Sequence, residues 1–438
     1  MGVFKAYDVR GVYGEALTDE LAYRIGFFLP RIIEGKKIAV GSDMRNSSPK
    51  LKEELIRGLA DAGCIIYDIG LISTPMINFA VVHHGLDGGV QITASHNGPK
   101  YNGFKVAKKN AVPVGFETGL DRLEKLCAEE ELSPGPKGRV EKLDIMPEYI
   151  MHVRKFLKTD RHFRIAIDAG NGMAGHTVPG ILKDLSIAYD GIYMEPDGNF
   201  PNHEADPLKE ENLRDIKKKV REGRYDFGIA FDGDADRIMF IDEKGENIAA
   251  DIVTAMLGEW FVRKGNDGVI YDVRSTKMIR ESVSAAGGHS YLCQVGHAYL
   301  KKMMREKDAF FGGELAGHFY FKENFYTDSG VITLMKMLNF LAEKNAPLSE
   351  LAAAYKKYFP SGEINSEVDD KDGKIEEVSK AYSDGEQFRV DGLTVIYDRW
   401  WFNIRKSNTE PLLRLVLEAE TEEIMKTRSA EVLKKIRG

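Results

Sequence analysis

The most distinctive chemical motif in this sequence is a set of three aspartates at alternate positions. Asp232, Asp234 and Asp236 stand in the string D-G-D-A-D-R. In an extended segment, such alternation places all three carboxylates on one face. Converging carboxylates repel one another unless a cation lies among them, and oxygen ligands of this kind favour Mg²⁺ or Ca²⁺ over zinc or copper. We therefore predict a divalent-metal site at this motif.

An EF-hand loop and a solvated acidic turn are the competing interpretations of the aspartate motif. The alternation matches the start of an EF-hand loop, and Glu243 stands where that loop places its last carboxylate. However, Arg237 occupies the position where the EF-hand turn needs glycine, and β-like runs rather than helices flank the motif. A hydrophobic run leads into the loop and another, residues 238–241, follows it. Both features favour a metal site between two strands.

Ser95 is the candidate nucleophile. It comes directly after the strand-like string V-Q-I-T-A, and Lys100 and Lys105 follow it closely. A metal, a lysine and a serine together suit phosphoryl transfer, in which catalysis consists mostly of positioning and charge neutralisation. His96 is a poor candidate for the base, because neighbouring residues of an extended chain point to opposite sides. Taken alone, a serine in a loop is more often structural than catalytic.

Two further polar loops carry residues suited to a sugar phosphate. In G-G-E-L-A-G-H, Glu314 and His318 accompany glycines that let the backbone approach a small polyol closely. The loop Arg405–Thr409 offers guanidinium, hydroxyl and amide donors, a composition suited to a phosphate dianion. Each loop by itself is more often a solvated or hydrogen-bonded polar turn than a functional site.

The elements that position these loops follow an α/β pattern. Strand-like and helix-like stretches alternate from Lys36 to Asn97, and the alternation restarts at Phe163 and again at Asp251. A strand–helix–strand order predicts largely parallel sheets, in which ligands bind beyond the carboxyl ends of the strands. After about Phe359 the sequence pattern changes to acidic turns and short β-like runs, followed by a helical pattern over 421–437. We predict a smaller, mixed α+β domain there.

Composition excludes several classes of protein. The chain has 438 residues, with 61 Lys and Arg against 68 Asp and Glu, so its formal net charge is -7. A net negative charge argues against nucleic acid or an anionic membrane as the main partner, and no apolar run approaches the length of a membrane span. Cys64, Cys127 and Cys293 lie far apart, without a C-x-x-C string or a secretory leader. We therefore expect a cytoplasmic protein with reduced cysteines.

Taken together and in this order, the loops resemble the α-D-phosphohexomutase family, in particular its phosphomannomutase/phosphoglucomutase branch. The resemblance runs from F-K-A-Y-D-V-R-G near the N-terminus to R-K-S-N-T-E-P near the C-terminus. It implies three related mixed α/β domains and a C-terminal α+β domain resembling the TATA-binding protein, arranged around a central cleft. The implied domains are a catalytic phosphoserine domain (1–146), a metal-binding domain (147–246), a sugar-binding domain (247–357) and a phosphate-binding domain (358–438).

The resemblance also implies residue roles. Ser95 resembles the serine that carries a phosphoryl group, and the three aspartates resemble a site for one Mg²⁺ that is completed by an oxygen of phosphorylated Ser95. The residues that resemble the other catalytic groups are Arg10, Lys105, Arg237 and His318. Those that resemble substrate-binding groups are Arg274, Glu314, His318, Arg405, Ser407, Asn408 and Thr409.

Some positions depart from the family pattern. Ala316 replaces a serine that is usual in the sugar loop of this branch, so one hydroxyl donor is missing. Gly98 stands where many members have proline, and Arg274 where the branch often has lysine, another cation. Leu315 stands where the glucosamine branch tends to have glutamine, which counts against glucosamine phosphate.

We therefore predict a Mg²⁺-dependent phosphohexomutase that interconverts hexose 1-phosphate and hexose 6-phosphate, with mannose and/or glucose as the sugar. Phosphorylated Ser95 would donate to the substrate, so that a hexose 1,6-bisphosphate is both intermediate and activator. A phosphoglucosamine mutase, a metal-dependent sugar-phosphate phosphatase and a non-enzymatic sugar-phosphate sensor are the alternatives. The sequence does not distinguish a monomer from a homo-oligomer.

Overall fold

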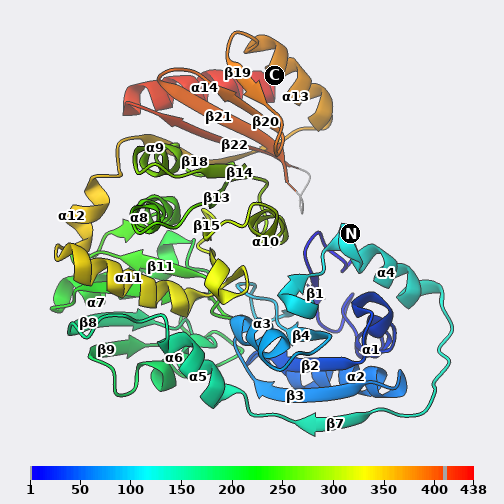
Figure 1. Cartoon of the computed structure of the whole chain (residues 1–438). Helices are drawn as coiled ribbons and strands as arrows, with labels where there is room; N and C mark the ends of the chain where they lie inside the picture. Colours follow the sequence, from blue (N-terminus) through cyan, green and yellow to red (C-terminus); the bar gives the residue numbers. More distant parts are fainter. Residues whose placement is uncertain (1, 408–411) are drawn as a thin grey trace. The chain divides into compact units, whose positions relative to one another are not determined.

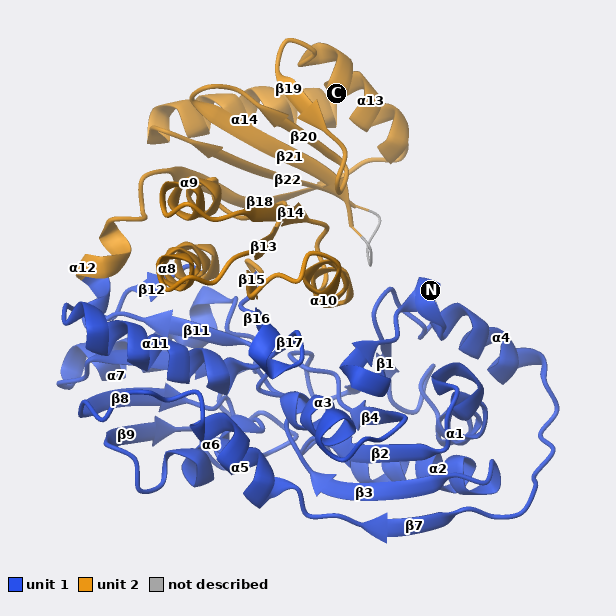
Figure 2. Ribbon diagram, viewed as in Figure 1, with its two compact units in different colours: residues 1–249, 316–349 blue, residues 250–315, 350–438 orange. Residues whose placement is uncertain are grey.

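The computed structural model describes residues 2–407 and 412–438 of the chain. These residues form two compact units, one of residues 2–249 and 316–349 and one of residues 250–315, 350–407 and 412–438 (Figure 2). Figure 1 shows the helices and strands within each unit. Mixed sheets with helices are followed by a C-terminal antiparallel sheet with two helices, so the predicted multi-domain α/β architecture is confirmed. The four predicted domain limits remain a prediction.

The first sheet of unit 1 holds the strand that leads to Ser95. Its order is β1 (Val9–Val12), β5 (Tyr101–Lys108), β4 (Gly88–Ile92), β2 (Lys37–Ser42), β3 (Ile65–Leu71) and β7 (Arg139–Lys142), with β6 (Val112–Pro113) beside β5. Its helices are α1 (Asp19–Ile33), α2 (Ser48–Asp61), α3 (Thr74–His83), α4 (Leu120–Glu129) and the short η1 (Lys109–Ala111) and η2 (Phe116–Thr118). Strands β4, β2, β3 and β7 are parallel, as the strand–helix alternation predicts.

Two adjacent glycines on β4 show how helices cover both faces of this sheet. A Cβ atom at Gly88 would meet Ile33 of α1, whereas one at Gly89 would meet Ile77 of α3. Since successive strand residues point to opposite faces, α1 and α3 pack on opposite sides of β4. The strand is fully buried. Only the residues beyond its carboxyl end are left to reach a ligand.

The second sheet of unit 1 holds the strands on either side of the aspartate motif. Its order is β12 (Asn247–Ile248), β11 (Ile238–Ile241), β10 (Phe227–Phe231), β8 (Phe163–Asp168) and β9 (Ile187–Ile192). Its helices are α5 (Met146–Arg154), α6 (Ala174–Leu182), η3 (Glu210–Leu213) and α7 (Arg214–Glu222). The rest of unit 1 contains the hairpin of β16 (Phe319–Phe321) and β17 (Thr327–Asp328), η4 (Lys322–Asn324) and α11 (Gly330–Lys344), and α12 (Leu348–Ala353) follows.

Unit 2 contains two groups of strands. In the first, β13 (Val269–Asp272) lies between β14 (Ser290–Cys293) and β15 (Phe311–Gly313), parallel to both, with helices α8 (Ala250–Arg263), α9 (Met278–Ala285) and α10 (His297–Glu306). The second is an antiparallel sheet of β18 (Phe359–Glu367), β22 (Leu412–Ala419), β21 (Trp400–Lys406), β20 (Leu393–Ile396) and β19 (Glu386–Phe388), with helices α13 (Lys371–Ala381) and α14 (Glu422–Arg437). The hydroxyl of Thr421 accepts a hydrogen bond from the Ile424 N–H and so caps α14, the predicted closing helix.

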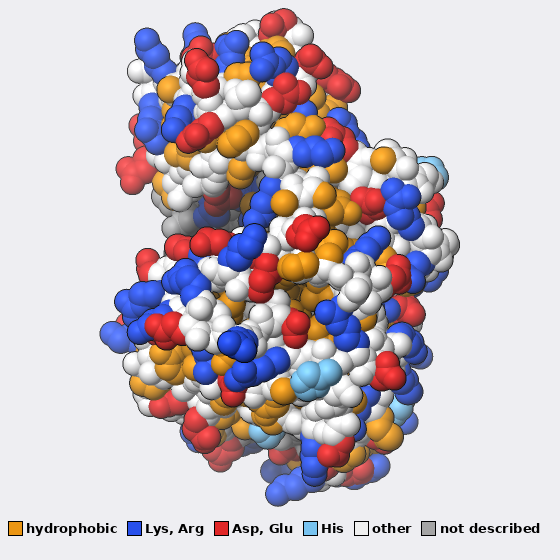
Figure 3. Space-filling view, turned by 90° about the vertical axis from the view of Figure 1, so that its left-hand side faces the viewer, with side chains coloured by type: hydrophobic (Ala, Val, Ile, Leu, Met, Phe, Trp, Pro, Cys, Tyr) orange, Lys and Arg blue, Asp and Glu red, His pale blue; other side chains and the backbone are white. Residues whose placement is uncertain are grey.

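On the face drawn in Figure 3, Lys and Arg side chains are interspersed with Asp and Glu side chains. This mixture of charges agrees with the small formal net charge of -7 for the chain. Among the described residues, no helix has both the length and the apolar character needed to cross a membrane.

Asp251 makes the stability of unit 2 depend on pH. Its buried carboxylate accepts hydrogen bonds from the N–H groups of Ile252 and Thr276, both at 2.9 Å. Burial nevertheless raises its pKa to about 6. An unfolded aspartate has a pKa near 3.9, so the folded state binds this proton more tightly. Below about pH 4, the proton on Asp251 contributes its full amount to the free energy of unfolding. This contribution, about 3 kcal/mol, is lost as the pH rises through about 6.

Asp251→Asn removes this titration. We expect the melting temperature of the variant, relative to that of the wild type, to rise between pH 4 and pH 7, because only the wild type loses stability there. Differential scanning calorimetry at several pH values measures this difference, with the exposed Asp398→Asn as the control. Parallel melting profiles of Asp251→Asn and wild type would show that Asp251 carries no such penalty.

Candidate active site

Ser95 lies just beyond the carboxyl end of β4, in a turn rather than in an extended segment. Its φ is +51°, in the left-handed region, and its N–H donates to the Thr93 hydroxyl at 2.9 Å. Its own hydroxyl donates to Oδ2 of Asp232 at 2.8 Å, and the residue is 1% exposed. A non-glycine residue in this region is uncommon and is found more often at functional sites.

The turn corrects one expectation about His96. An extended chain would point Ser95 and His96 to opposite sides, but the left-handed φ of Ser95 brings Oγ to 3.4 Å from His96 Nδ1. Burial and the charges of Arg237 and Arg10 hold the pKa of His96 well below its usual value, so its imidazole is neutral. The expected separation of the two side chains is therefore wrong.

The three aspartates converge, as the alternation predicts, but in a turn. They follow the buried strand β10 and precede β11, and Ala235 between them has a φ of +60°. Their carboxylates are all buried, and one oxygen from each lies within 4.8 Å of the others. Two antiparallel strands flank the motif, so an EF-hand, which needs helices, is excluded.

Lys105 on β5 neutralises part of this negative charge. Its Nζ lies 2.7 Å from Asp234 Oδ2 and 2.6 Å from Asp236 Oδ2. Burial would lower the pKa of Lys105, but the two carboxylates raise it above its usual value. Burial and the neighbouring carboxylates raise the pKa of Asp232 well above its usual value. Burial opposes ionisation of Asp236 as well, but Lys105 and His318 hold its pKa well below the usual value.

The aspartate motif meets the requirements for a hard divalent cation. Oδ1 of Asp234 is buried and accepts no hydrogen bond from any residue in the described part of the chain. An isolated buried carboxylate oxygen is costly unless a cation or donor satisfies it. The three carboxylates offer oxygen ligands only, which suits Mg²⁺. A second group of metal-binding side chains, Asp236 with His318 and Asp328, shares one aspartate with the motif but includes a nitrogen ligand.

Arg237 and His318 lie beside the aspartates. The Arg237 Nε is 3.7 Å from Asp232 Oδ2 and donates to His318 Nε2 at 3.2 Å. His318 Nε2 is also 3.3 Å from Asp236 Oδ1. The first contact needs an unprotonated Nε2 and the second a protonated one, so the proton on His318 selects between the two partners. Such a group is suited to moving a proton at the site.

Arg10 connects β1 with the serine turn. Its Nη1 donates to Asn97 Oδ1 at 2.6 Å, while its Nε donates to Asp8 at 3.1 Å. Arg10 pairs in register with Gly103 of β5, where a Cβ atom would lie only 2.1 Å from the Val9 carbonyl oxygen. The glycine therefore permits the close approach of the two strands that places Arg10 here.

Arg45 was not anticipated from the sequence. It follows β2 in the string S-D-M-R, is 1% exposed, and uses all five of its N–H donors. One binds Asp43 at 3.0 Å, and the others bind the backbone carbonyls of Ser95 (2.7 Å), Asn97 (2.7 Å), Gly98 (2.9 Å) and Tyr101 (3.0 Å). Arg45 thus holds the whole serine turn. The available signal was its place after a buried strand, beside the strand that leads to Ser95.

The other predicted site residues lie in unit 2. At the end of β13, Arg274 Nη2 is 2.8 Å from Asp272 Oδ2, and that oxygen also accepts from the Leu315 N–H at 2.9 Å. Glu314 is buried, and its Oε1 accepts from the Gly296 N–H at 3.0 Å. Asp272 at the end of β13 therefore holds both Arg274 and the backbone next to the sugar-loop residue Glu314.

The predicted phosphate loop is described only in part. Arg405 on β21 is buried and pairs with Glu363, and its Nε has no hydrogen-bond partner among residues 2–407 and 412–438. Burial and the nearby charge of Arg274 lower its pKa. The Ser407 N–H donates to the Leu412 carbonyl at 2.9 Å, and Asn408 and Thr409 lie outside the described residues. A buried guanidinium group with an unsatisfied donor among the described residues favours binding of an anion at Arg405.

The chain was compared with families of known proteins. Four family descriptions match the chain in order: Phosphoglucomutase/phosphomannomutase alpha/beta/alpha domain I (residues 1–133), domain II (147–245) and domain III (244–358), and the C-terminal domain (363–435). A phosphomannomutase of Escherichia coli is 36% identical over 446 residues, covering 98% of each chain. A phosphomannomutase of Methanocaldococcus jannaschii is 38% identical, covering 98% of this chain and 96% of its own.

A solved structure is similar along the same length. The crystal structure of a phosphoglucomutase/phosphomannomutase family protein from Burkholderia thailandensis superposes with a TM-score of 0.92 at 30% identity. The match covers 99% of this chain and 96% of that one. Similarity therefore extends over both units and over all four matched family domains.

Proposed function

The chain belongs to the phosphoglucomutase/phosphomannomutase family and is a phosphohexomutase, and we propose that it interconverts the 1-phosphates and 6-phosphates of mannose and/or glucose. The observation that supports the detailed proposal best is the contact between the Ser95 hydroxyl and Asp232 within the buried cluster of three aspartates and Lys105. A nucleophilic oxygen beside a candidate metal site is the arrangement that phosphoryl transfer through a serine requires.

The reaction would consist of two phosphoryl transfers. In the first, the Oγ–P bond of phosphorylated Ser95 breaks and Oγ takes up a proton, while a bond forms between phosphorus and the free hydroxyl oxygen of the monophosphate, whose proton passes to a base. The product is a hexose 1,6-bisphosphate. In the second, the O–P bond of the other phosphate of the bisphosphate breaks and phosphorus bonds to Ser95 Oγ, which gives up its proton. The leaving sugar oxygen takes up a proton, and the isomeric monophosphate is released. A hexose 1,6-bisphosphate supplied from outside would therefore also activate unphosphorylated enzyme.

Residues of unit 1 would position and neutralise the transferring group. Asp232, Asp234 and Asp236 would hold Mg²⁺, which supplies positive charge to the phosphoryl oxygens. Lys105 and Arg237 would add positive charge that is already in place before reaction, so that little reorganisation is needed. Arg10 would act through its contact with Asn97 in the serine turn.

His318 is the proposed proton-transferring group. Its Nε2 has a donor, Arg237, and a carboxylate, Asp236, within 3.3 Å, so protonated and neutral forms each find a partner. A group that is stabilised in both states can accept a proton in one transfer and return it in the other.

Residues of unit 2 would bind the sugar and the phosphate that is not being transferred. Glu314 would accept hydrogen bonds from ring hydroxyls, and Arg274 would bind sugar or phosphate oxygens. The remaining proposed phosphate ligands are Arg405, Ser407, Asn408 and Thr409. The unpartnered Nε of buried Arg405 supports this assignment.

The proposed specificity for mannose and glucose depends on what the sugar loop contacts. The two sugars differ only at C2, so contacts to shared hydroxyls do not separate them, and discrimination needs a buried partner for the 2-position. Leu315 offers no side-chain hydrogen bond to an amino group there. Curated relatives named phosphomannomutase support the same choice.

One steady-state comparison tests the proposed activity. The values of kcat/KM for the 1-phosphates of mannose, glucose and glucosamine are measured with a trace of hexose 1,6-bisphosphate, and inorganic phosphate is measured in parallel. We expect turnover of the mannose and/or glucose substrate with little release of phosphate. Preference for glucosamine phosphate would contradict the proposed substrate, and stoichiometric phosphate release would indicate hydrolysis instead.

We propose a cytoplasmic location for the enzyme. The three cysteines are free and buried, which suits a reducing compartment.

Asp234→Asn is expected to raise the Mg²⁺ concentration for half-maximal activity about tenfold or more, because a charged oxygen ligand is lost. Titration of Mg²⁺ at saturating substrate measures this shift. The matched control is Asp160→Asn, the same chemical change at an exposed position of unit 1. An unchanged Mg²⁺ dependence in Asp234→Asn would remove the aspartate motif from the metal site.

A further inference from the structure

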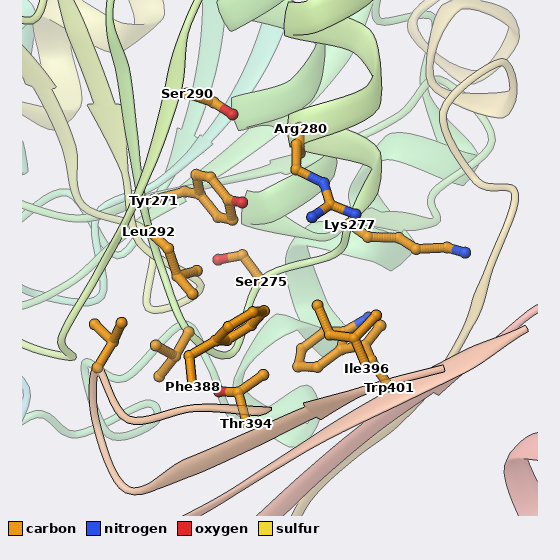
Figure 4. Close-up of a pocket in the computed structure, with 12 residues that line it drawn as sticks. Tyr271, Ser275, Lys277, Arg280, Ser290, Leu292, Phe388, Thr394, Ile396 and Trp401 are labelled. Carbon is orange, nitrogen blue, oxygen red and sulfur yellow. The ribbon is translucent and has the colours of Figure 1, made fainter. Parts of the chain in front are cut away.

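A cavity of about 370 Å³ lies within unit 2, and none of the residues that line it is a proposed catalytic residue (Figure 4). Its lining comes from β13 and the turn after it, β14, the start of α9, and strands β19, β20 and β21. Its volume falls at the lower end of the range of roughly 300–1,000 Å³ that is usual for small-molecule sites. It is therefore large enough for a small organic molecule.

The C-terminal sheet presents its second face to this cavity. On β21, Trp400 and Phe402 pack into the core beneath α13 and α14, so Trp401 between them faces the other way. On β20, Val395 lies in the same core, and Thr394 and Ile396 line the cavity. The indole N–H of Trp401 donates to Glu418 at 2.7 Å, which leaves its ring as an apolar wall.

The opposite side of the cavity carries polar and basic side chains, of which Lys277 has Glu281 as a counterion at 3.9 Å. Ser275 is 3% exposed, and its hydroxyl has no hydrogen-bond partner among the described residues. The exposed Arg280 forms no ion pair with any residue that the structure describes, and the Lys277 ammonium lies over the ring of Tyr358. Figure 4 shows Arg280, Lys277 and Ser275 across from Phe388, Ile396 and Trp401.

A buried hydroxyl without a partner carries a desolvation cost that a bound acceptor would remove. An arginine without a counterion at the rim of an apolar cavity can bind a carboxylate with two hydrogen bonds. The aliphatic and aromatic walls would leave the hydroxyls of a sugar unsatisfied, so they favour an apolar ligand body. Together these groups specify a ligand with one anionic end and one apolar end.

We propose that this cavity binds an amphipathic carboxylate, with its carboxylate paired to Arg280 and hydrogen-bonded to the Ser275 hydroxyl. Its aryl or alkyl body occupies the space between Leu292, Phe388 and Trp401. The site adjoins both proposed phosphate-binding elements. Ser275 follows Arg274 in the chain, and Trp401 shares one face of β21 with Arg405. The ligand thus spans the turn that carries one of these arginines and the strand that carries the other.

The probe for this site is 4-phenylbutyrate, added to the full-length protein at millimolar concentration. Isothermal titration calorimetry is expected to show saturable binding of one molecule per chain, and binding to the folded state raises the melting temperature. The uncharged 4-phenylbutan-1-ol, which keeps the apolar body, is expected to bind about tenfold more weakly because it cannot pair with Arg280. Equal binding of acid and alcohol would contradict the proposed anionic end.

Three variants locate the probe. Leu292→Trp fills the cavity and should abolish binding, while Arg280→Gln, a change at an exposed side chain that the fold does not need, should weaken it about tenfold. Arg399→Gln removes an exposed arginine of the same unit outside the cavity and should leave binding unchanged. The proposal is overturned if the wild type shows no saturable binding, or if Arg280→Gln binds as tightly as the wild type. Unchanged binding by a folded Leu292→Trp variant would equally place the probe elsewhere.

Discussion

Ser95→Ala is expected to lower the mutase kcat by about 10⁴-fold or more, while the folded protein still binds a hexose 1,6-bisphosphate. The substitution removes the only atom of this residue that can carry the phosphoryl group. It costs little in packing, since the lost contacts are the hydrogen bond to Asp232 and the longer contact with His96. The N–H of residue 95 keeps its bond to the Thr93 hydroxyl, so the turn should persist.

The experiment separates chemistry from binding. The kcat is measured with a coupled assay for hexose 6-phosphate, bisphosphate binding is measured by calorimetry, and the phosphorylated residue is located by mass spectrometry after incubation with bisphosphate. Ser282→Ala is the matched control, because Ser282 is a buried serine whose hydroxyl, among the residues that the structure describes, bonds only to backbone carbonyls. Near wild-type turnover by Ser95→Ala, or a phosphate on another residue of the wild type, would refute the serine mechanism.

The same site shows which structural features could be predicted from sequence. The buried strand before the aspartates was predictable, because a continuous apolar run bounded by polar turns indicates a strand of a covered sheet. The strand before Ser95 contains Gln91 and was predictable from the strand–helix alternation around it. The convergence of the aspartates was also predictable from their spacing. The direction of the chain beyond each strand was not predictable, because nothing in the residue types of Ser95 and Ala235 indicates their left-handed φ values.

The error about His96 has this origin. Side-chain alternation holds only while the backbone stays extended, and the chain leaves that conformation at Ser95. A local rule therefore failed at the position where the site departs from regular structure. Strained conformations of this kind are concentrated at functional residues, where the surrounding structure stabilises them.

The role of Arg45 could not be predicted from the sequence either. Its carbonyl partners belong to residues 95–101, about fifty positions further along the chain, and backbone carbonyls have no sequence signature. Only the parallel pairing of β2 with β4 brings the two segments together. Sequence motifs locate side-chain chemistry, whereas the residues that position a backbone become visible only in three dimensions.

Arg45→Lys is therefore expected to lower kcat about a hundredfold, with a much smaller change in KM. Lysine keeps the positive charge but has three donors in place of a rigid fork of five, so it cannot hold all four carbonyls and Asp43 together. The serine turn would then sample positions in which Oγ is misplaced relative to the aspartates. We expect slower phosphorylation of Ser95 by bisphosphate in single-turnover experiments, while substrate contacts elsewhere are kept.

A purely structural role of Arg45 predicts a different pattern, and Asp43→Asn distinguishes the two. Asp43 pairs with Arg45 in a fully buried ion pair and also hydrogen-bonds to the Thr93 side chain, but it makes no hydrogen bond to residues 95–101 themselves. Asp43→Asn should lower the melting temperature, because it removes the counterion of a buried charge, yet leave kcat within a few-fold of wild type since the four carbonyl bonds remain. If Arg45 only stabilised the fold, both variants would lose activity in proportion to the folded fraction, and kcat per folded molecule would stay constant. Partial recovery of turnover by Arg45→Ala in added guanidinium, at concentrations that leave the fold intact, would show instead that the donors themselves position Ser95.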